Sequence, residues 1–195
     1  MSIDAKQVAE LRAQTGAGII DCKNALTESN GDFEAAVLFL KKKGLATAAK
    51  KAERATSEGL IESYIHAGGK IGVMIQLNCE TDFVAKNDGF KSLARDIAMH
   101  IAALSPQYVH RQEVPAALID KERDIAKEQC AGKPEAAIEK IVTGKLDKFF
   151  ADNCLLEQAF VKDPSITVQE LVASLIAKMG ENITVGKFTR YQVGS

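Results

Sequence analysis

The connection at residues 80–86, Glu-Thr-Asp-Phe-Val-Ala-Lys, carries the side chains of this chain that are best suited to binding. It follows an alternating apolar stretch at 71–79 and precedes a long amphipathic stretch, so it places an aromatic residue, Phe83, between a strand and a helix. Binding groups are often carried by connections between rigid elements. Phe83, flanked by Thr81 and Asp82, is therefore a candidate wedge that inserts into a partner. The alternative is that Phe83 folds back into the core, and the local pattern leaves both readings open.

The thiols and imidazoles, which can bind metals or act as nucleophiles, are scattered along the chain. There is no Cys-x-x-Cys pair and no histidine at ligand spacing, whereas a metal site needs clustered soft ligands. A catalytic cysteine would also need a nearby base. We therefore expect no metal, no cofactor and structural roles for Cys22, Cys79, Cys130, Cys154, His66, His100 and His110.

Other arrangements that are typical of an enzyme are missing from the sequence as well. Carboxylates are frequent in the predicted helices, but none lies beside glycines and a histidine in a pattern that suggests acid–base catalysis. Gly16 and Gly18 resemble part of a phosphate-binding loop, yet no strand precedes them and no Gly-Lys-Ser/Thr follows. The sequence favours a binding protein over an enzyme.

Length and composition indicate a globular protein whose partners are other proteins. With 195 residues, 46% of them hydrophobic, the chain can form one ordinary domain and a small second one. The charged residues nearly cancel to a net charge of -1, so we expect neither nucleic acid nor a membrane surface as a partner. Residues 1–15 are too polar for a signal peptide and no later stretch is long enough to span a bilayer, so we expect a cytoplasmic protein.

Apolar residues in the first forty positions recur at helical spacing. Segments 15–18 and 29–32 separate them, which predicts a compact unit of three helices, with Asp32 as the cap of the third. We expect residues 41–44 to end this unit and residues 46–56, rich in Ala and Lys, to form a separate linker helix. The apolar residues are Val8, Leu11, Ile19, Cys22, Leu26, Phe33, Val37 and Leu40.

Three later segments predict a small antiparallel sheet packed with helices. Residues 60–66 and 71–79 alternate between apolar and polar side chains on either side of a glycine pair, which is typical of a hairpin. A helical apolar stripe at 90–104 can cover the apolar face of the second strand. Residues 183–193 predict a final strand, in which Gly186 is a possible bulge.

Two further patterns predict helices between the second and the last strand. Two helical runs at about 115–153 are divided by Ala-Gly-Lys-Pro at 131–134, and glycine after one helix with proline before the next predicts a helical hairpin. Thr167 and Glu170 form the capping box of another helix, which Gly180 ends.

The expected fold is therefore α+β, in two parts. Residues 1–54 form the N-terminal three-helix unit and its linker helix. Residues 55–195 form a core in which a small antiparallel sheet packs with helices and carries the hairpin. No repeat at a fixed period is visible, so we expect a single core module.

Two segments in combination resemble a known family. Residues 11–26, LRAQTGAGIIDCKNAL, and residues 78–86, NCETDFVAK, are similar to elongation factor Ts in their order and separation. The run at 180–194 resembles the final strand of that family, and the resemblance extends over essentially the whole chain. It implies that the N-terminal unit is ubiquitin-associated-like and that the remainder is a dimerisation-type core domain.

The resemblance also implies a function. Elongation factor Ts is a translation elongation factor without a chemical active site: it is a guanine-nucleotide exchange factor that binds elongation factor Tu, both GDP-bound and nucleotide-free. The resemblance implies that the connection at residues 80–86 enters the nucleotide domain of elongation factor Tu. There it disturbs the magnesium site of elongation factor Tu and promotes GDP release so that GTP can bind. The residues implicated are Thr81, Asp82, Phe83 and Val84.

The N-terminal unit is expected to bind the same domain of elongation factor Tu. Ile19 and Ile20, at the start of its second helix, are the candidate contacts. Two adjacent large apolar side chains cannot both face one side of a helix, so we expect one of them to pack internally.

Two other classes of function stay open. Three-helix units also bind ubiquitin-like proteins, peptides or, as helix-turn-helix units, DNA, although the near-neutral charge counts against DNA. An enzyme with Cys79 as its nucleophile is the remaining alternative, and it requires an exposed thiol of low pKa.

A homodimer is the last expectation. Longer members of the resembled family carry two related core modules that pack together, whereas this chain has one. Its strands at 71–79 and 183–193 would leave an apolar face or an edge uncovered, which a second copy related by a two-fold axis can cover. The alternative is that the hairpin at 115–153 folds over that face.

Overall fold

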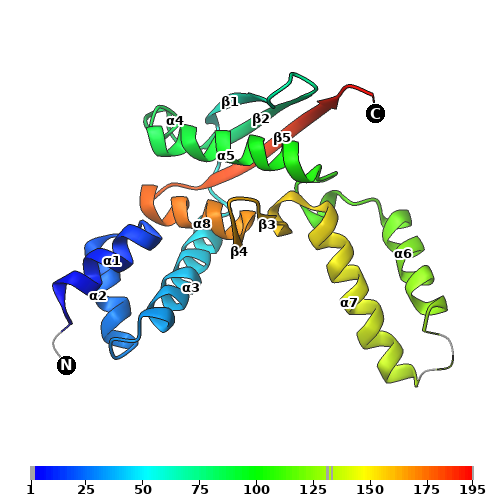
Figure 1. Ribbon diagram of the computed structural model, residues 1–195, viewed down its shortest axis with the longest axis horizontal. Coiled ribbons are helices and arrows are strands. Elements are labelled where there is room, and N and C mark those ends of the chain that lie inside the picture. Colours follow the sequence, from blue (N-terminus) through cyan, green and yellow to red (C-terminus); the bar gives the residue numbers. More distant parts are fainter. Residues whose placement is uncertain (1–2, 131, 133, 195) are drawn as a thin grey trace.

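The protein has the expected α+β fold. The structure, a computed structural model, describes residues 3–130, 132 and 134–194, so Ala131 and Lys133 of the predicted inter-helix segment lie outside the described residues. Figure 1 shows the N-terminal helices at the lower left, the sheet at the top and a helical hairpin projecting at the lower right.

The N-terminal unit consists of helices α1 (Ala5–Thr15) and α2 (Ile19–Glu28) and the first half of α3 (Phe33–Lys51). Asp32 caps α3 as expected, because its carboxylate accepts a hydrogen bond from the backbone amide of Ala35 at 3.0 Å. Apolar side chains from all three helices form a small core of their own, made of Leu11, Cys22, Ala25, Leu26 and Ala36.

The expectation of a separate linker helix after residue 44 is wrong, because α3 continues without interruption to Lys51. Gly44 is buried where α3 crosses helix α8 (Val168–Met179), and a Cβ atom at this position would lie 3.8 Å from the carbonyl oxygen of Ala173. A Cβ atom would fit there in ordinary van der Waals contact, so Gly44 is an interior residue of α3 at a helix crossing and does not end the helix. Ala48, one turn later, packs against the main core.

The sheet contains β1 (Glu58–Ile65), β2 (Ile71–Cys79) and β5 (Ile183–Gln192), paired antiparallel in the order β1-β2-β5. The predicted bulge is confirmed: Gln76 lies opposite Lys187 and Leu77 lies opposite Val185, which leaves Gly186 as the extra residue. A Cβ atom on Gly186 would approach the Asn78 side-chain amide nitrogen to 2.9 Å, so a larger residue here would require the Asn78 and Gln76 side chains to shift.

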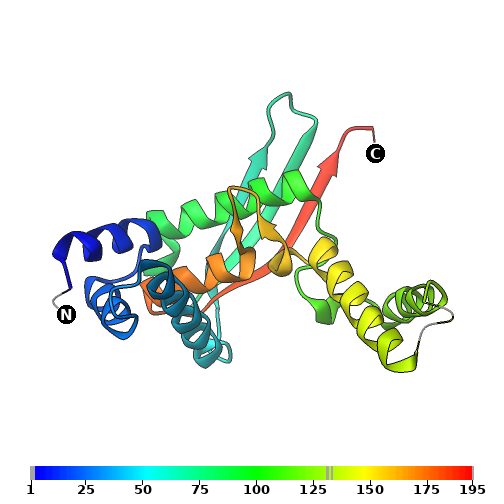
Figure 2. The same ribbon diagram turned by 60° about the horizontal axis from the view of Figure 1, so that its bottom comes forward.

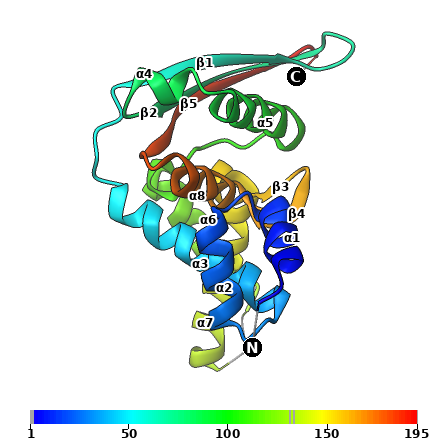
Figure 3. The same ribbon diagram turned by 90° about the vertical axis from the view of Figure 1, so that its left-hand side faces the viewer.

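Helices cover only one side of this sheet in the part of the chain that the structure describes. Figure 3 shows the sheet at the top, then α5 (Asp88–Leu104) beside the short helix α4 (Asp82–Ala85), and then α8. The Thr167–Glu170 capping box and the left-handed Gly180 at the end of α8 are both confirmed. The main core lies between these layers and includes Val73, Ile75, Leu77, Phe90, Ile97, Ile101, Val168 and Ile176.

The predicted helical hairpin is formed by α6 (Ala116–Glu128) and α7 (Glu135–Asn153). The 3-10 turns η1 (Arg111–Glu113) and η2 (Leu155–Glu157) join it to the rest of the molecule. A small two-stranded ribbon, β3 (Ala159–Phe160) and β4 (Asp163–Thr167), follows η2. Figures 1 and 2 show the hairpin leaving the body on the side away from the sheet. The alternative that it folds over the sheet is therefore wrong.

Candidate functional site

The connection between β2 and α5 presents Phe83 to solvent. Its short helix α4 contains four residues, and Phe83 is 82% exposed whereas the next residue, Val84, is buried in the main core. Successive residues of a helix point about 100° apart, so burial of Val84 turns the Phe83 ring outward. The reading in which Phe83 folds back into the core is excluded by this exposure.

Asp82 lies next to Phe83 and forms an ion pair on the surface of α4. Lys86 donates a hydrogen bond to its carboxylate at 2.6 Å, four residues later. The pKa of Asp82 lies below its ordinary value, chiefly because of this hydrogen bond, and the pKa of Lys86 is raised by the same contact. Asp82 is therefore a negative charge at neutral pH, placed beside the exposed aromatic ring.

Thr81 and Glu80 attach the connection to the segment between α8 and β5. The Glu181 carboxylate accepts hydrogen bonds from the backbone amides of Glu80 and Thr81, at 3.2 and 3.0 Å, and from the Thr81 hydroxyl at 2.6 Å. Sequence reasoning assigned residues 180–194 only to a helix end and a strand. It missed this contact because partners about one hundred residues apart leave no local pattern.

Ile19 and Ile20 both lie on the surface of the N-terminal unit, 58% and 75% exposed. The expectation that one of them packs internally is wrong, because the core side of α2 is already occupied by Cys22, Ala25 and Leu26. The side chains do diverge, since Ile19 lines a groove of about 350 Å³ against α1. The other lining residues of that groove are Ile3, Ala5, Val8, Ala9, Arg12 and Lys23.

The two sets of predicted site residues lie in different parts of the molecule. Thr81, Asp82, Phe83 and Val84 are contiguous at the end of the sheet, whereas Ile19 and Ile20 lie at the start of α2. Figures 1 and 3 show α2 and α4 apart from each other. A partner that contacts both sets must therefore span the end of the sheet and the N-terminal unit.

Cys79, the candidate nucleophile, is buried under the same connection. Its thiol donates a hydrogen bond to the carbonyl oxygen of Thr81 at 3.1 Å, and burial, followed by the charge of Glu181, raises its pKa. Cys154 is buried as well, and burial raises its pKa to about 11. A nucleophilic cysteine needs an accessible thiolate, so neither thiol fits that role.

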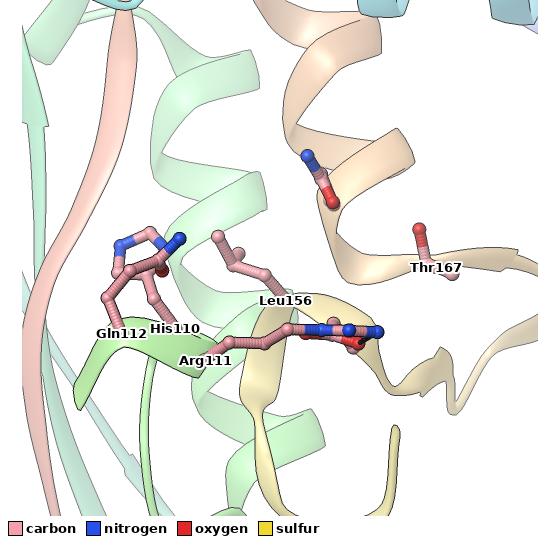
Figure 4. Close-up of a pocket in the computed structure, with 7 residues that line it drawn as sticks. His110, Arg111, Gln112, Leu156 and Thr167 are labelled. Atoms are coloured by element: carbon pink, nitrogen blue, oxygen red, sulfur yellow. Dashed lines mark hydrogen bonds and ion pairs between the residues drawn. The ribbon is translucent and has the colours of Figure 1, made fainter. Parts of the chain in front are cut away.

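A second hollow, of about 470 Å³, lies at the base of the hairpin and is shown in Figure 4. Arg111 on its floor donates hydrogen bonds to Glu157 at 2.5 and 2.7 Å and to Asp147 at 3.0 Å. The guanidinium also lies 4.5 Å from the centre of the Phe150 ring. Because two carboxylates already neutralise this cation, and raise its pKa, Arg111 anchors the hairpin and offers no free charge to an anion.

Comparison with known proteins assigns the chain to a family. A family model described as Elongation factor TS matches residues 44–195. The chain belongs to the elongation factor Ts family. Elongation factor Ts of Geobacter sulfurreducens is 60% identical over 196 residues, which cover 100% of this chain and 91% of that protein. Elongation factor Ts of Fervidobacterium nodosum is 59% identical over 196 residues, which cover 100% of both chains.

Membership of the elongation factor Ts family confirms the resemblance carried by residues 11–26 and 78–86. The family model begins at Gly44, so the first of these segments lies outside its range, but the full-length relatives match both. The chain is thereby placed among the translation elongation factors. Among the residues that the structure describes, no helix is long and apolar enough to cross a membrane.

Proposed function

We propose that this chain is a guanine-nucleotide exchange factor for elongation factor Tu. It binds the GDP-bound and the nucleotide-free forms of this partner, disturbs the partner's magnesium site and promotes GDP release so that GTP can bind. The observation that carries the proposal is the exposure of Phe83 on a connection attached to the core on both sides. A large aromatic side chain held away from its own core is available for burial in a partner.

Such a factor needs binding energy and no reactive group. If it binds nucleotide-free elongation factor Tu more tightly than the GDP complex, linkage requires that it weakens GDP binding by the same factor. Burial of the Phe83 ring contributes roughly 1.5 to 3 kcal/mol, which is enough to favour one conformation of the partner roughly tenfold to a hundredfold. The coupling between two binding equilibria thus replaces chemical catalysis.

The position of Asp82 extends this mechanism to the magnesium ion of the partner. Phe83 enters between elements of the nucleotide domain, and the ionised Asp82 follows it into the same region. The magnesium ion bridges the nucleotide phosphates and protein ligands, so displacement of its ligands weakens the hold on GDP. Thr81 and Val84 frame these two residues and set their direction.

The N-terminal unit contributes a second contact with the same domain of elongation factor Tu. Ile19 and Ile20 support this role because both are exposed and neither is needed for the core of the unit. Ile19 lines the largely apolar groove against α1, whereas Ile20 does not. Two separated contacts make the binding orientation specific, because neither alone fixes how the partner is rotated.

We further propose that the chain acts without a chemical active site, a cofactor or a metal of its own, in the cytoplasm. The burial and raised pKa of Cys79 support this view, since they leave the best-placed thiol protonated. The single titratable side chain next to Phe83 in α4, Asp82, is committed to an ion pair with Lys86.

We propose that the outer face of the sheet pairs with a second copy of the chain. Large apolar residues are exposed on this face, opposite the side that α5 covers: Ile61, Ile65, Met74 and Tyr191. Ile65 and Tyr191 flank Gly72 in one row across the three strands, and the Ile65 side chain reaches over the glycine. A second copy related by a two-fold axis can cover these apolar side chains with the same ones of its own.

The release of a fluorescent GDP from elongation factor Tu tests the exchange function directly. We expect substoichiometric amounts of this protein to accelerate the release, because a factor that leaves after each exchange acts on many partner molecules. An unchanged release rate at saturating protein would refute the proposal. Retention on DNA that weakens with salt, without any effect on GDP release, would favour the nucleic-acid alternative.

A further inference from the structure

Glu181 is the residue that joins the Phe83 connection to the start of β5, at the same end of the sheet, where Cys79 pairs with Ile183. It follows Gly180, the left-handed residue that ends α8, and its carboxylate reaches residues that lie one hundred positions earlier. One oxygen accepts both backbone amides, of Glu80 and Thr81, and the other accepts the Thr81 hydroxyl. All three donors belong to the two residues that lead into α4.

Hydrogen bonds run in both directions between the two segments, because the Glu80 carboxylate in turn accepts a hydrogen bond from the segment between α8 and β5. This carboxylate accepts the backbone amide of Asn182 at 2.6 Å and lies 3.5 Å from the guanidinium of Arg54. Asn182 is buried, and its side-chain amide donates to the carbonyl oxygens of Ala52 and Arg54, at 3.3 and 2.8 Å. The two glutamates therefore cross-link the Phe83 connection, the α8–β5 connection and the chain that leaves α3.

The helix that carries Phe83 cannot fix its own orientation. It has a single turn, and one helical turn is unstable by itself because several backbone dihedrals are fixed for one hydrogen bond. Thr81 is the N-cap residue of α4, and threonine commonly caps helices. The Thr81 side chain nevertheless makes no capping hydrogen bond to α4. The hydroxyl is instead used by Glu181.

We propose that Glu181 is a positioning residue for nucleotide exchange, which holds the backbone of Thr81 so that Phe83 and Asp82 meet the partner in a fixed direction. This inference rests on the proposed exchange function. A side chain that is already ordered before binding loses less conformational entropy in the complex, so a fixed connection binds more tightly than a mobile one. Glu181 acts through Thr81 and does not itself contact the partner.

Glu181 and Glu170 form a matched pair for the test, because both are glutamates that accept backbone amides at an end of α8. Glu170 accepts the amide of Thr167 at 2.8 Å in the capping box and has no part in the Phe83 connection. Glu181→Ala should slow GDP release from elongation factor Tu about tenfold, since it removes three hydrogen bonds to a charged acceptor. Glu170→Ala should lower the melting temperature and leave the release rate within about twofold of the parent.

Two further variants separate positioning from a general loss of structure. Glu181→Gln keeps an oxygen for the two backbone amides, and its amide group can donate to the Thr81 hydroxyl, so it should restore the rate to within about threefold of the parent. In a Phe83→Ala background, Glu181→Ala should slow the rate clearly less than the roughly tenfold expected in the parent, because only Asp82 is left to position.

The outcomes distinguish this inference from the proposed function. A normal rate for Phe83→Ala would overturn the role of the connection itself, whereas a slow Phe83→Ala with a normal Glu181→Ala would overturn only the positioning role. Equal losses from Glu181→Ala in both backgrounds, or from Glu170→Ala and Glu181→Ala alike, would also overturn it. If Glu181→Ala does not fold, two variants of Thr81 replace it. Thr81→Val removes the hydroxyl that donates to Glu181, and Thr81→Ser keeps it. GDP release must then be slower with Thr81→Val than with Thr81→Ser.

Discussion

Phe83 and Val84 are neighbours on one helical turn and have opposite environments. Phe83 is 82% exposed, whereas Val84 is 9% exposed and belongs to the main core. The Phe83 side chain is therefore available to a partner, whereas the Val84 side chain holds the turn on the sheet. Substitution of each in turn separates binding from folding.

Phe83→Ala should slow GDP release from elongation factor Tu roughly tenfold to a hundredfold, since it removes an apolar surface worth roughly 1.5 to 3 kcal/mol on burial. Its melting temperature should stay that of the parent, because the ring has few contacts to lose. Asp82→Ala should slow release less, as it removes little apolar area. Full activity of both variants would contradict the role of this connection.

Val84→Ala should have the converse effect on stability. Loss of two buried methyl groups should lower the free energy of unfolding by about 1 to 3 kcal/mol, a decrease of several degrees in melting temperature for a chain of this size. Thermal melts followed by circular dichroism measure this change. A melting temperature equal to that of the parent would show that the turn is not anchored by Val84.

Deletions at the N-terminus should show that α3 serves both parts of the molecule. A chain that begins at Gly44 keeps the contacts of Gly44 and Ala48 with the core and should melt cooperatively while binding elongation factor Tu poorly. Removal of residues 1–54 also deletes the carbonyl groups that accept the buried Asn182 amide, which should cost about 1 to 3 kcal/mol more. Melting curves and a pull-down with elongation factor Tu measure the two effects. If the chain that begins at Gly44 binds like the full chain, the N-terminal unit is not a contact.

Light scattering should give a mass of about twice 21.0 kDa for the parent protein at micromolar concentration, as a homodimer through the outer sheet face requires. Ile65→Glu should reduce this mass to that of one chain, because it places a charge on the apolar side chains of the proposed contact. Ile125→Glu on α6, an exposed isoleucine far from the sheet, is the matched control and should stay dimeric. A parent mass of 21.0 kDa that does not rise with concentration would rule out the dimer.

His100 should make the stability of the fold depend on pH. The imidazole is buried: Val161 donates its amide to Nδ1 at 3.2 Å, so Nε2 carries the proton and donates to Gln158 at 3.0 Å. Burial lowers the pKa of His100 from its ordinary value of 6.5. Below that value the unfolded chain gains a proton that the folded chain does not, so stability is complete above it and falls as the pH falls.

The measurement is the melting temperature of the parent and of His100→Gln at about pH 8 and about pH 5, roughly one and a half pH units above and below the ordinary histidine pKa. The variant cannot titrate at this position and should lose less stability on acidification, although it is less stable throughout. His66→Gln, which replaces an exposed imidazole, is the control for the loss of a histidine elsewhere in the chain. Identical pH dependence for His100→Gln and the parent would contradict a role for this imidazole.

Local patterns in the sequence predicted most of the elements and several of their details. The alternation at residues 71–79 predicted a strand whose apolar face is buried, and Gly186 was recognised as the bulge. The capping box at Thr167 and the end of α8 at Gly180 also follow from residues within a few positions of each other. These predictions succeed because periodicity and capping depend on neighbours in the chain.

The predictions that failed concern what distant segments do to a local pattern. Gly44 was expected to end a helix, but α8 packs against it and the helix continues. One of Ile19 and Ile20 was expected inside, but other side chains of α2 already fill the small core. At Gly44 the deciding contact comes from a helix more than one hundred residues later in the chain, and at Ile19 and Ile20 it is the way in which the whole three-helix unit packs that decides which side of α2 is buried.

By itself the sequence determined the order of the main helices and of the three strands of the sheet, the apolar face of the second strand, and the connection on which Phe83 lies. Only the tertiary structure decided that Phe83 faces solvent, that Glu181 holds the backbone before it, and that the outer face of the sheet stays uncovered. The physical reason is that the exposure of a side chain depends on every segment that packs nearby. For this connection, one of those segments lies one hundred residues away along the chain.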